Sequence, residues 1–315
     1  MAKYIIRRVL IALIVLFGIT VIDFLIMSLL GNPIEILSGG PKVSDAMLAR
    51  RAESMGLDQP VIVQYLNWLK AVMHGDFGYS YTDYQPVSNQ IVSHLGPTLI
   101  LTVSALVLSL IIAVAGGIYS AVHVHSKGDY AIVTLSFIGQ SVPGFFLALL
   151  LIYIFAVRLG WVPASGMREL GTDTEGVSVA HLILPCVTLA VSMAGRNIRY
   201  IRSAMLEILN RDYLRAAEAR GIGKKRVIWK HALRNALIPI LTVTGMEIPG
   251  LFGGSVIIEQ VFSWPGIGLL TVNAVLTRDY PVIMAVCLLS AVVVLVANLL
   301  LDILYAVVDP TVRLT

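Results

Sequence analysis

Glu247 has the most unusual setting of any ionisable residue in this sequence, because it lies at the middle of an apolar run that covers residues 236–258. A carboxylate at that depth in a membrane is costly and usually faces protein or water. Pro249 and Gly250 follow it closely, and both residue types weaken a helix. Two interpretations stay open: a kinked, tightly packed helix interface, or a carboxylate lining a translocation pathway inside a deformable helix.

A second interruption falls inside the apolar run 131–157, at Ser141-Val142-Pro143-Gly144. Proline removes a backbone donor and glycine adds conformational freedom, so this tetrapeptide would weaken the helix and could serve as a bend. Bends of this kind let a membrane helix change its course near a pathway. The candidate pathway residues are Glu247, Pro249, Gly250 and Pro143.

A charged stretch between two apolar runs carries residues that could bind a partner protein. The apolar positions from Leu206 onward, namely Leu206, Leu209, Tyr213 and Ala216/Ala217, fall on one face of a helix. Gly221 permits the backbone reversal that ends it, and a second amphipathic piece follows from Lys224 to Leu233. A helix-turn-helix with one apolar face at a membrane surface indicates a coupling element. Its candidate docking residues are Arg215, Ala216, Ala217, Glu218, Gly221, Ile222 and Lys224.

The sequence lacks the patterns of an enzyme. Gly221-Ile222-Gly223-Lys224 does not have the strand, the spacing or the following Ser/Thr of a phosphate-binding loop. His123-x-His125 is half of a metal site without companion ligands, so solvated loop histidines are the favoured interpretation. We therefore expect no catalytic residue, no metal site and no cofactor in this chain. Any ATP and Mg²⁺ that its activity needs would have to be bound by another chain.

Composition predicts the elements that must position these residues. The 315-residue chain is 57% hydrophobic and 13% charged, whereas a soluble domain carries roughly a quarter of charged residues. Runs of about 20 apolar residues span a bilayer as helices. We therefore predict an all-α polytopic membrane protein with six transmembrane helices, at Val9–Leu30, Leu99–Val122, Ala131–Val157, Val177–Ala194, Ala236–Ile258 and Val282–Val308.

The positions of lysine and arginine predict the orientation. Eleven of them lie between the fourth and fifth predicted spans, from Arg196 to Arg234, and Lys3, Arg7 and Arg8 precede the first span. With six spans these regions lie on the same side, so we expect both termini and the coupling element to be cytoplasmic. The net charge of +4 reflects this bias, and nucleic-acid binding is not expected.

Three regions follow along the chain. Residues 1–30 form the cytoplasmic N-terminus and first span, and residues 31–96 a small helical extracytoplasmic segment. Residues 97–315 form a five-helix transmembrane core that includes the coupling segment 204–234. Within the outer segment, Ser44–Met55 could be one helix, and a stripe of Val61, Tyr65, Trp68/Leu69 and Val72 predicts another that ends at Gly75. This segment could pack as a lid on its own spans, dock an external partner, or do both.

Nearly the whole chain resembles the permease subunits of binding-protein-dependent ABC importers of the oligopeptide/dipeptide/nickel type. The family's Glu-Ala-Ala-x-x-x-Gly coupling motif reads Arg215-Ala216-Ala217-x-x-x-Gly221 here, with arginine in place of glutamate. The other segments that carry the resemblance are Ile6–Arg8, Gly56–Pro60, Gln64-Tyr65, Gly75–Gly78, His231–Pro239, Phe262–Gly268 and Arg278–Val282.

The resemblance implies an alternating-access importer in a bacterial-type cytoplasmic membrane. Its partners would be a second homologous permease, two ABC ATPase subunits that the coupling helices contact, an extracytoplasmic substrate-binding protein and the lipid bilayer. Peptides are the expected substrates, with nickel or another metal–chelator complex as the alternative. A gradient-driven carrier that works alone, and a membrane scaffold, are the remaining alternatives.

Overall fold

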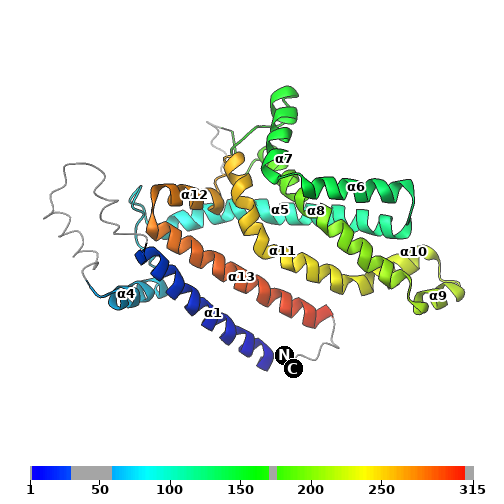
Figure 1. Cartoon of the computed structure of the whole chain (residues 1–315), viewed down its shortest axis with the longest axis horizontal. Coiled ribbons are helices and arrows are strands. Elements are labelled where there is room, and N and C mark those ends of the chain that lie inside the picture. The colour runs from blue at the N-terminus through cyan, green and yellow to red at the C-terminus, as the bar shows by residue number, and fades with distance from the viewer. Residues whose placement is uncertain (1, 30–58, 170–175, 309–315) are drawn as a thin grey trace. The chain divides into compact units, whose positions relative to one another are not determined.

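The computed structural model describes residues 2–29, 59–169 and 176–308, and this part of the chain is almost entirely helical. It contains one isolated antiparallel bridge, between Tyr79 and Pro86. The helices, labelled in Figure 1, are α1 (Ala2–Leu29), α4 (Val61–Met73), α5 (Val87–Val122), α6 (Lys127–Ser141), α7 (Gly144–Leu151), the π-helical turn η1 (Ile152–Arg158), α8 (Val179–Leu209), α9 (Asp212–Ala219), α10 (Lys224–Arg226), the π-helical turn η2 (Val227–Ala232), α11 (Leu233–Val261), α12 (Ile267–Thr277) and α13 (Tyr280–Val308). The helix proposed for Ser44–Met55 lies outside the described residues.

Four helices in the described ranges are long and apolar enough to cross a bilayer: Ile6–Leu29, Val87–Val122, Val179–Leu209 and Tyr280–Ile303. The pair Lys127–Ser141 and Gly144–Arg158 makes a fifth span if its two arms count as one. The predicted span 236–258 lies within α11, a single helix. The all-α membrane fold is therefore confirmed, and the exact number of six spans stays a prediction.

The predicted bend at Ser141–Gly144 is confirmed. The helix axis bends by 102° between the arms α6 and α7–η1, because the backbone of Val142 and Pro143 leaves the helical region, with ψ angles of 123° and 134°. The Pro143 carbonyl nevertheless accepts a bond from the Leu147 amide and so starts the next helix. This break turns the chain sharply within an apolar segment.

The helix that covers most of the predicted fourth span, Val177–Ala194, continues well beyond it. Helix α8 runs without interruption to Leu209 and carries Arg196, Arg199 and Arg202 within it. Arg199 donates to the Gln140 side chain of α6, and the other two arginines pair with carboxylates on α11 and α6, as described below. Tertiary pairing therefore allows the helix to continue where the hydropathy of the sequence falls.

The chain divides into two compact units. The first comprises residues 1–96 and 269–296. In it α4 packs on α1, where the rings of Phe24, Tyr65 and Trp68 lie 5.4–6.2 Å apart. Tyr65, Trp68, Leu69 and Val72 are half-buried whereas Val61 is exposed. The predicted stripe on α4 is thus confirmed except at its first position.

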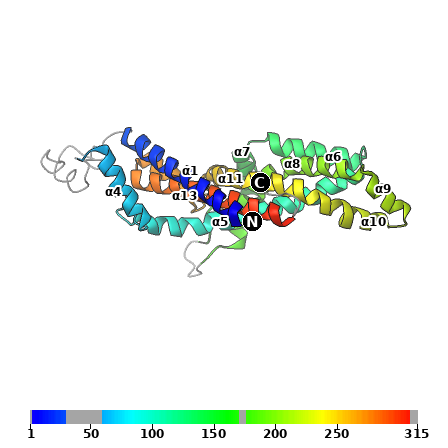
Figure 2. The ribbon, with the colours of Figure 1, turned by 90° about the horizontal axis from the view of Figure 1, so that it is seen from below.

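The second unit comprises residues 97–268 and 297–315. Helix α8 packs against both α6 and α11, and Figures 1 and 2 show α6 and α8 side by side. One apolar core, which includes Leu101, Leu189, Phe262 and Trp264, joins α5, α7, α8 and α11. A second core lies at the α9 end of α8. These two cores hold the helices on which the candidate site residues lie.

The segment Phe262–Gly268 is a buried turn that closes on α5. Glu259, Phe262 and Trp264 are almost fully buried, and the Trp264 indole donates to the Pro97 carbonyl at 3.0 Å. Thr98 Oγ1 donates to the Glu259 carboxylate at 2.8 Å. A Cβ at Gly266 would lie 2.5 Å from that carboxyl group, so this close approach requires glycine.

Candidate functional site

The proposed coupling element is a short helix held against the membrane core by one leucine. Leu214 of α9 and Val227 of η2 are fully buried in the same apolar cluster, and Ala217 and Ile222 pack at its edge. Tyr213 accepts a hydrogen bond from Asn235 at 2.9 Å. The cluster therefore fixes α9 and the turn after it as one body with α8, η2 and α11.

The turn after α9 has the left-handed geometry that glycine favours. Gly221 has a φ of +81°, its amide bonds to the Glu218 carbonyl at 2.9 Å, and the Ile222 amide bonds to the Ala217 carbonyl at 3.2 Å. This pair of bonds is the Schellman motif of a helix C-terminus. The prediction that Gly221 ends the helix is confirmed.

The register of the predicted helix is wrong in one respect. A continuous helix from Leu206 would place Tyr213 and Ala216 on the apolar face, but the chain breaks at Asn210 and Arg211 between α8 and α9. The break rotates α9, so Leu214 points into the core while Tyr213 and Ala216 are exposed. Leu206 lies on α8 instead.

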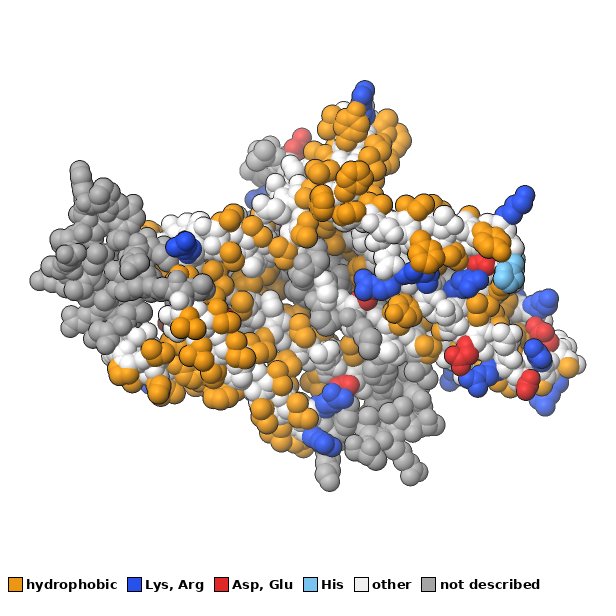
Figure 3. Space-filling view, viewed as in Figure 1, with side chains coloured by type: hydrophobic (Ala, Val, Ile, Leu, Met, Phe, Trp, Pro, Cys, Tyr) orange, Lys and Arg blue, Asp and Glu red, His pale blue; other side chains and the backbone are white. Residues whose placement is uncertain are grey.

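The exposed face of the element carries most of the predicted docking residues. Arg215, Ala216, Glu218, Gly221 and Lys224 are exposed, whereas Ala217 and Ile222 are half-buried. Lysine and arginine side chains gather over α9 and α10 in Figure 3. Trp229 of η2 is also exposed, at 55%. Exposed tryptophan and arginine side chains are residue types enriched where proteins contact one another, so this face is suited to contact with another protein.

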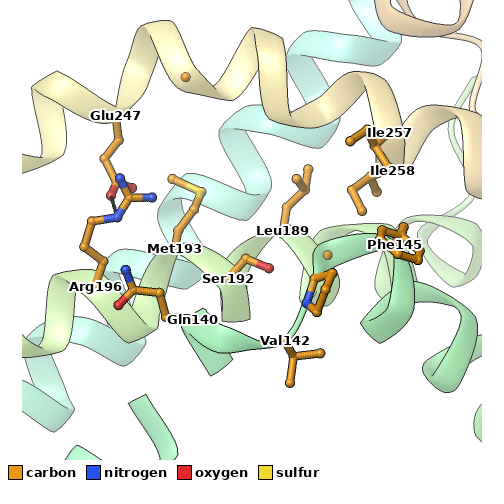
Figure 4. Close-up of a pocket in the computed structure, with 13 residues that line it drawn as sticks. Gln140, Val142, Phe145, Leu189, Ser192, Met193, Arg196, Glu247, Ile257 and Ile258 are labelled. Carbon is orange, nitrogen blue, oxygen red and sulfur yellow. Dashed lines mark ion pairs between the residues drawn. The ribbon is translucent and has the colours of Figure 1, made fainter. Parts of the chain in front are cut away.

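A cavity of about 570 Å³ lies among α7, α8, α11 and the break after α6. Figure 4 shows Glu247 of α11 meeting Arg196 of α8, with Met193 and Leu189 between the two helices. Pro143, Gly144 and Phe145 contribute to the opposite wall. The cavity is thus mostly apolar with one pair of charges.

The Glu247 carboxylate is 7% exposed and has two polar partners on α8. Arg196 Nε lies 3.3 Å from Oε1 as an ion pair, and Asn197 Nδ2 donates to Oε2 at 3.3 Å. The Arg196 side chain is half exposed and also lines the cavity. This arrangement presents opposite charges at one end of an apolar cavity.

Three of the four candidate pathway residues meet here, since Glu247, Gly250 and Pro143 all line the cavity. The side chain of Pro249 lies outside the described residues. The sequence reasoning missed Arg196 and Gln140, which also line it. For Arg196 the sequence held a signal, because it lies four residues after Ser192 and three after Met193, on the same face of the helix. It was missed because the predicted span ended at residue 194.

A buried ion pair joins three helices near the end of the bundle that carries α9. Arg202 of α8 donates to both oxygens of Asp129 on α6, each at 2.8 Å. Ser120 of α5 donates to the same carboxylate, as does the His125 amide at 3.0 Å. Bidentate pairing of this type is strong and directional. It fixes α5, α6 and α8 relative to one another.

The described residues include no group of three or more His, Cys, Asp or Glu side chains arranged to hold a metal. The His123 ring stacks on Tyr119 at 4.5 Å, and its Nδ1 lies 3.1 Å from the Tyr119 carbonyl. His125 lies beside Tyr130 instead, with their ring centroids 6.4 Å apart. The two histidines therefore have separate aromatic neighbours.

Residues 113–314 match the family described as binding-protein-dependent transport system inner membrane component, and residues 1–102 match the N-terminal region of such membrane components. The chain is 45% identical over 316 residues to the oligopeptide transport system permease protein AppB of Bacillus subtilis (strain 168), covering 99% of this chain and 100% of that protein. It is 38% identical over 314 residues to the glutathione transport system permease protein GsiC of Escherichia coli (strain K12), covering 99% of each.

Among solved structures, a chain of the inward-facing MetNI methionine ABC transporter has a similar fold. The TM-score is 0.58 at 20% identity, over 70% of this chain and 96% of that chain. At this identity the similarity concerns the fold alone.

Proposed function

Since this chain belongs to the inner membrane components of binding-protein-dependent transport systems and is a permease subunit of an ABC importer, we propose that it carries di- and oligopeptides. The observation that carries the proposal is full-length similarity to permeases whose names specify oligopeptides and glutathione, itself a tripeptide. Both relatives are covered almost end to end, so the similarity includes the segments that form the cavity.

The chemistry of the cavity supports peptides as substrates. Short peptides share two charged termini and differ in side chains, and a permissive route for them needs apolar walls with few charges. The cavity offers Glu247 and Arg196 at one end and side chains such as Leu189, Phe145 and Ile258 elsewhere. We place Glu247, Pro249, Gly250 and Pro143 on the translocation pathway, with the half-exposed Arg196 as the partner of Glu247.

The exposed face of α9 and its turn supports coupling to an ATPase. Arg215, Ala216, Ala217, Glu218, Gly221, Ile222 and Lys224 would contact the ATPase subunit, with the two alanines allowing close approach. The buried Leu214 would transmit the motion of α9 to the core shared by α8 and α11. ATP and Mg²⁺ would be bound by the partner subunits, and this chain would have no catalytic site of its own.

The assembly we propose contains this chain, a second homologous permease, two ATPases and an extracytoplasmic binding protein. Both termini and the α9–η2 segment would lie in the cytoplasm, because these segments are rich in lysine and arginine and cytoplasmic loops carry an excess of both. A six-span topology would place residues 31–96 on the outer side, where a binding protein docks.

Transport by the reconstituted complex tests the proposal. Proteoliposomes that contain both permeases and both ATPases, with binding protein outside and ATP inside, should accumulate labelled di- and tripeptides only when ATP is hydrolysed. A nickel–chelator complex offered in parallel should not accumulate. Uptake of the metal chelate in place of peptides, or peptide uptake driven by an ion gradient without ATP, would overturn it.

A further inference from the structure

A second cavity, of about 450 Å³, lies in the first unit among the loop before α5, the first turns of α5, the end of α12 and the start of α13. Most of the residues that line it are polar, and they include two carboxylates but no lysine or arginine. The polar lining residues are Ser80, Thr82, Asp83, Gln85, Asn89, Gln90, Ser93, His94, Asn273, Thr277 and Asp279. The cavity is therefore electronegative, unlike the apolar cavity at Glu247.

Asp279 is held in this cavity by the turn between α12 and α13. Arg278 takes a left-handed conformation with φ of 54°, and the Asp279 amide bonds to the Ala274 carbonyl at 2.8 Å. The Ser80 hydroxyl donates to Asp279 Oδ2, and the Thr82 amide lies 3.3 Å from the same oxygen. One carboxylate oxygen is thus fully engaged.

The other oxygen has no hydrogen-bond partner among the described residues. Asp279 is 2% exposed, and its Oδ1 is buried and unsatisfied. A buried charge without a partner is strongly unfavourable. The start of α13 contributes a partial positive charge that offsets part of the cost, but it supplies no donor to Oδ1. The carboxylate is therefore arranged to accept a donor that the described chain does not provide.

Two polar side chains lie close to Asp279 or share its cavity. Burial, together with the charge of Asp279, raises the pKa of the neighbouring Tyr81 hydroxyl to about 12. Asp83 is oriented by Gln90, whose amide nitrogen lies 2.7 and 2.9 Å from its two oxygens. The cavity thus places the carboxylates of Asp83 and Asp279 in one lining that contains no lysine or arginine.

We propose that this cavity binds a primary ammonium group. An ammonium brings three donors and a full positive charge, which matches the free Oδ1 of Asp279 and the neutral acceptors beside it. The cavity lies within the range of small-molecule sites and is larger than a dehydrated metal ion requires.

Two sources can bring this group to the site, if residues 31–96 face outward as the proposed topology has it. One is the amino terminus of an incoming peptide, and the other is a lysine side chain of the docked binding protein. The ligand chemistry is the same in both cases.

Binding to the purified full-length permease complex in nanodiscs, measured by calorimetry, tests the proposal without any transport step. The probes are alanyl-alanine amide, its N-acetylated form without an ammonium, and N-acetyl-lysine amide. Ammonium-bearing probes should bind and the acetylated dipeptide amide should not. Asp279→Asn should weaken binding about tenfold or more, as expected for loss of a charged hydrogen-bond acceptor.

Two further variants serve as a control and as a second test of the site. Asp76→Asn is the matched control, because Asp76 is an exposed carboxylate that does not line this cavity, and it should bind as the wild type does. Asn273→Leu replaces a polar lining residue by a larger apolar one without altering the carboxylate and should also weaken binding, which decides the matter if Asp279→Asn fails to fold.

The pattern of probes identifies the source. Preference for the free peptide terminus assigns the site to substrate, and preference for the lysine probe assigns it to the binding protein. Equal binding of the acetylated dipeptide amide, unchanged affinity in Asp279→Asn or Asn273→Leu, or no binding in the millimolar range would overturn the proposal. Because peptide uptake is not measured, failure here leaves the proposed function standing.

Discussion

Replacing Gly221 with valine should uncouple the permease from its ATPase while leaving the membrane helices intact. Gly221 has a φ of +81°, and a Cβ added there would meet no atom within 4 Å. The penalty therefore comes from the backbone conformation and not from a clash. The residues that would lose their position are those of the turn between α9 and α10.

The size of the effect follows from the left-handed conformation. An L-residue in that region costs about 1–2 kcal/mol, and a β-branched residue costs more. A change of that size alters a local equilibrium by a factor of about 5–30. If docking requires the closed turn, ATPase binding and ATP-dependent uptake should fall by at least this factor in Gly221→Val.

Two control variants isolate the cause. Gly221→Asn should retain most activity, because asparagine tolerates the left-handed region. Gly223→Val should also retain it, since Gly223 has φ −60° and ψ 142° and a Cβ there meets nothing within 4 Å. The assays are pull-down of the ATPase by the purified permease and uptake in proteoliposomes. Wild-type coupling in Gly221→Val, or equal loss in Gly223→Val, would refute the reasoning.

Three further predictions concern the second unit. Glu247→Gln should change the rate of peptide uptake without dissociating the complex, and an unchanged rate across pH would assign Glu247 to packing alone. Arg202→Met should lower the free energy of unfolding in detergent by about 3–5 kcal/mol, because it leaves the Asp129 carboxylate buried without its partner. Adding Asp129→Asn should recover part of the loss. Equal melting temperatures for wild type and Arg202→Met would contradict this. Gly266→Ala should destabilise by about 1–3 kcal/mol through overpacking against Glu259, and a melting temperature within error of wild type would show that the turn can relax.

The sequence predicts best what local patterns determine. The end of α9 at Gly221 follows from one glycine after an amphipathic segment, and the bend at Ser141–Gly144 follows from a Pro-Gly pair within an apolar run. Both are confirmed because backbone geometry at glycine and proline depends little on distant residues. The stripe on α4 is confirmed except at Val61, because the spacing of apolar residues determines which face of a helix packs.

Partners that are distant in sequence account for what the sequence could not predict. Helix α8 continues through Arg196 and Arg202 because these arginines pair with Glu247 and Asp129, which lie on other helices. The hydropathy of one segment cannot indicate such pairs. The break at Asn210 and Arg211 likewise shifts the buried face to Leu214, since a short helix takes its register from the core it joins.

The candidate sites divide in the same way. The positions of Glu247, Pro143 and Gly250 around one cavity require the fold, although each residue was singled out by its type. Asp279 and Ser80 are nearly 200 residues apart, so no local pattern could indicate that they share a cavity.

Purification of this chain from its native membrane in mild detergent, with identification of the proteins that accompany it, tests the central claim most directly. The account predicts recovery of a second permease and two P-loop ATPases, with ATP hydrolysis stimulated by the peptide-loaded binding protein. Recovery of this chain alone, active in liposomes without ATP, would contradict it.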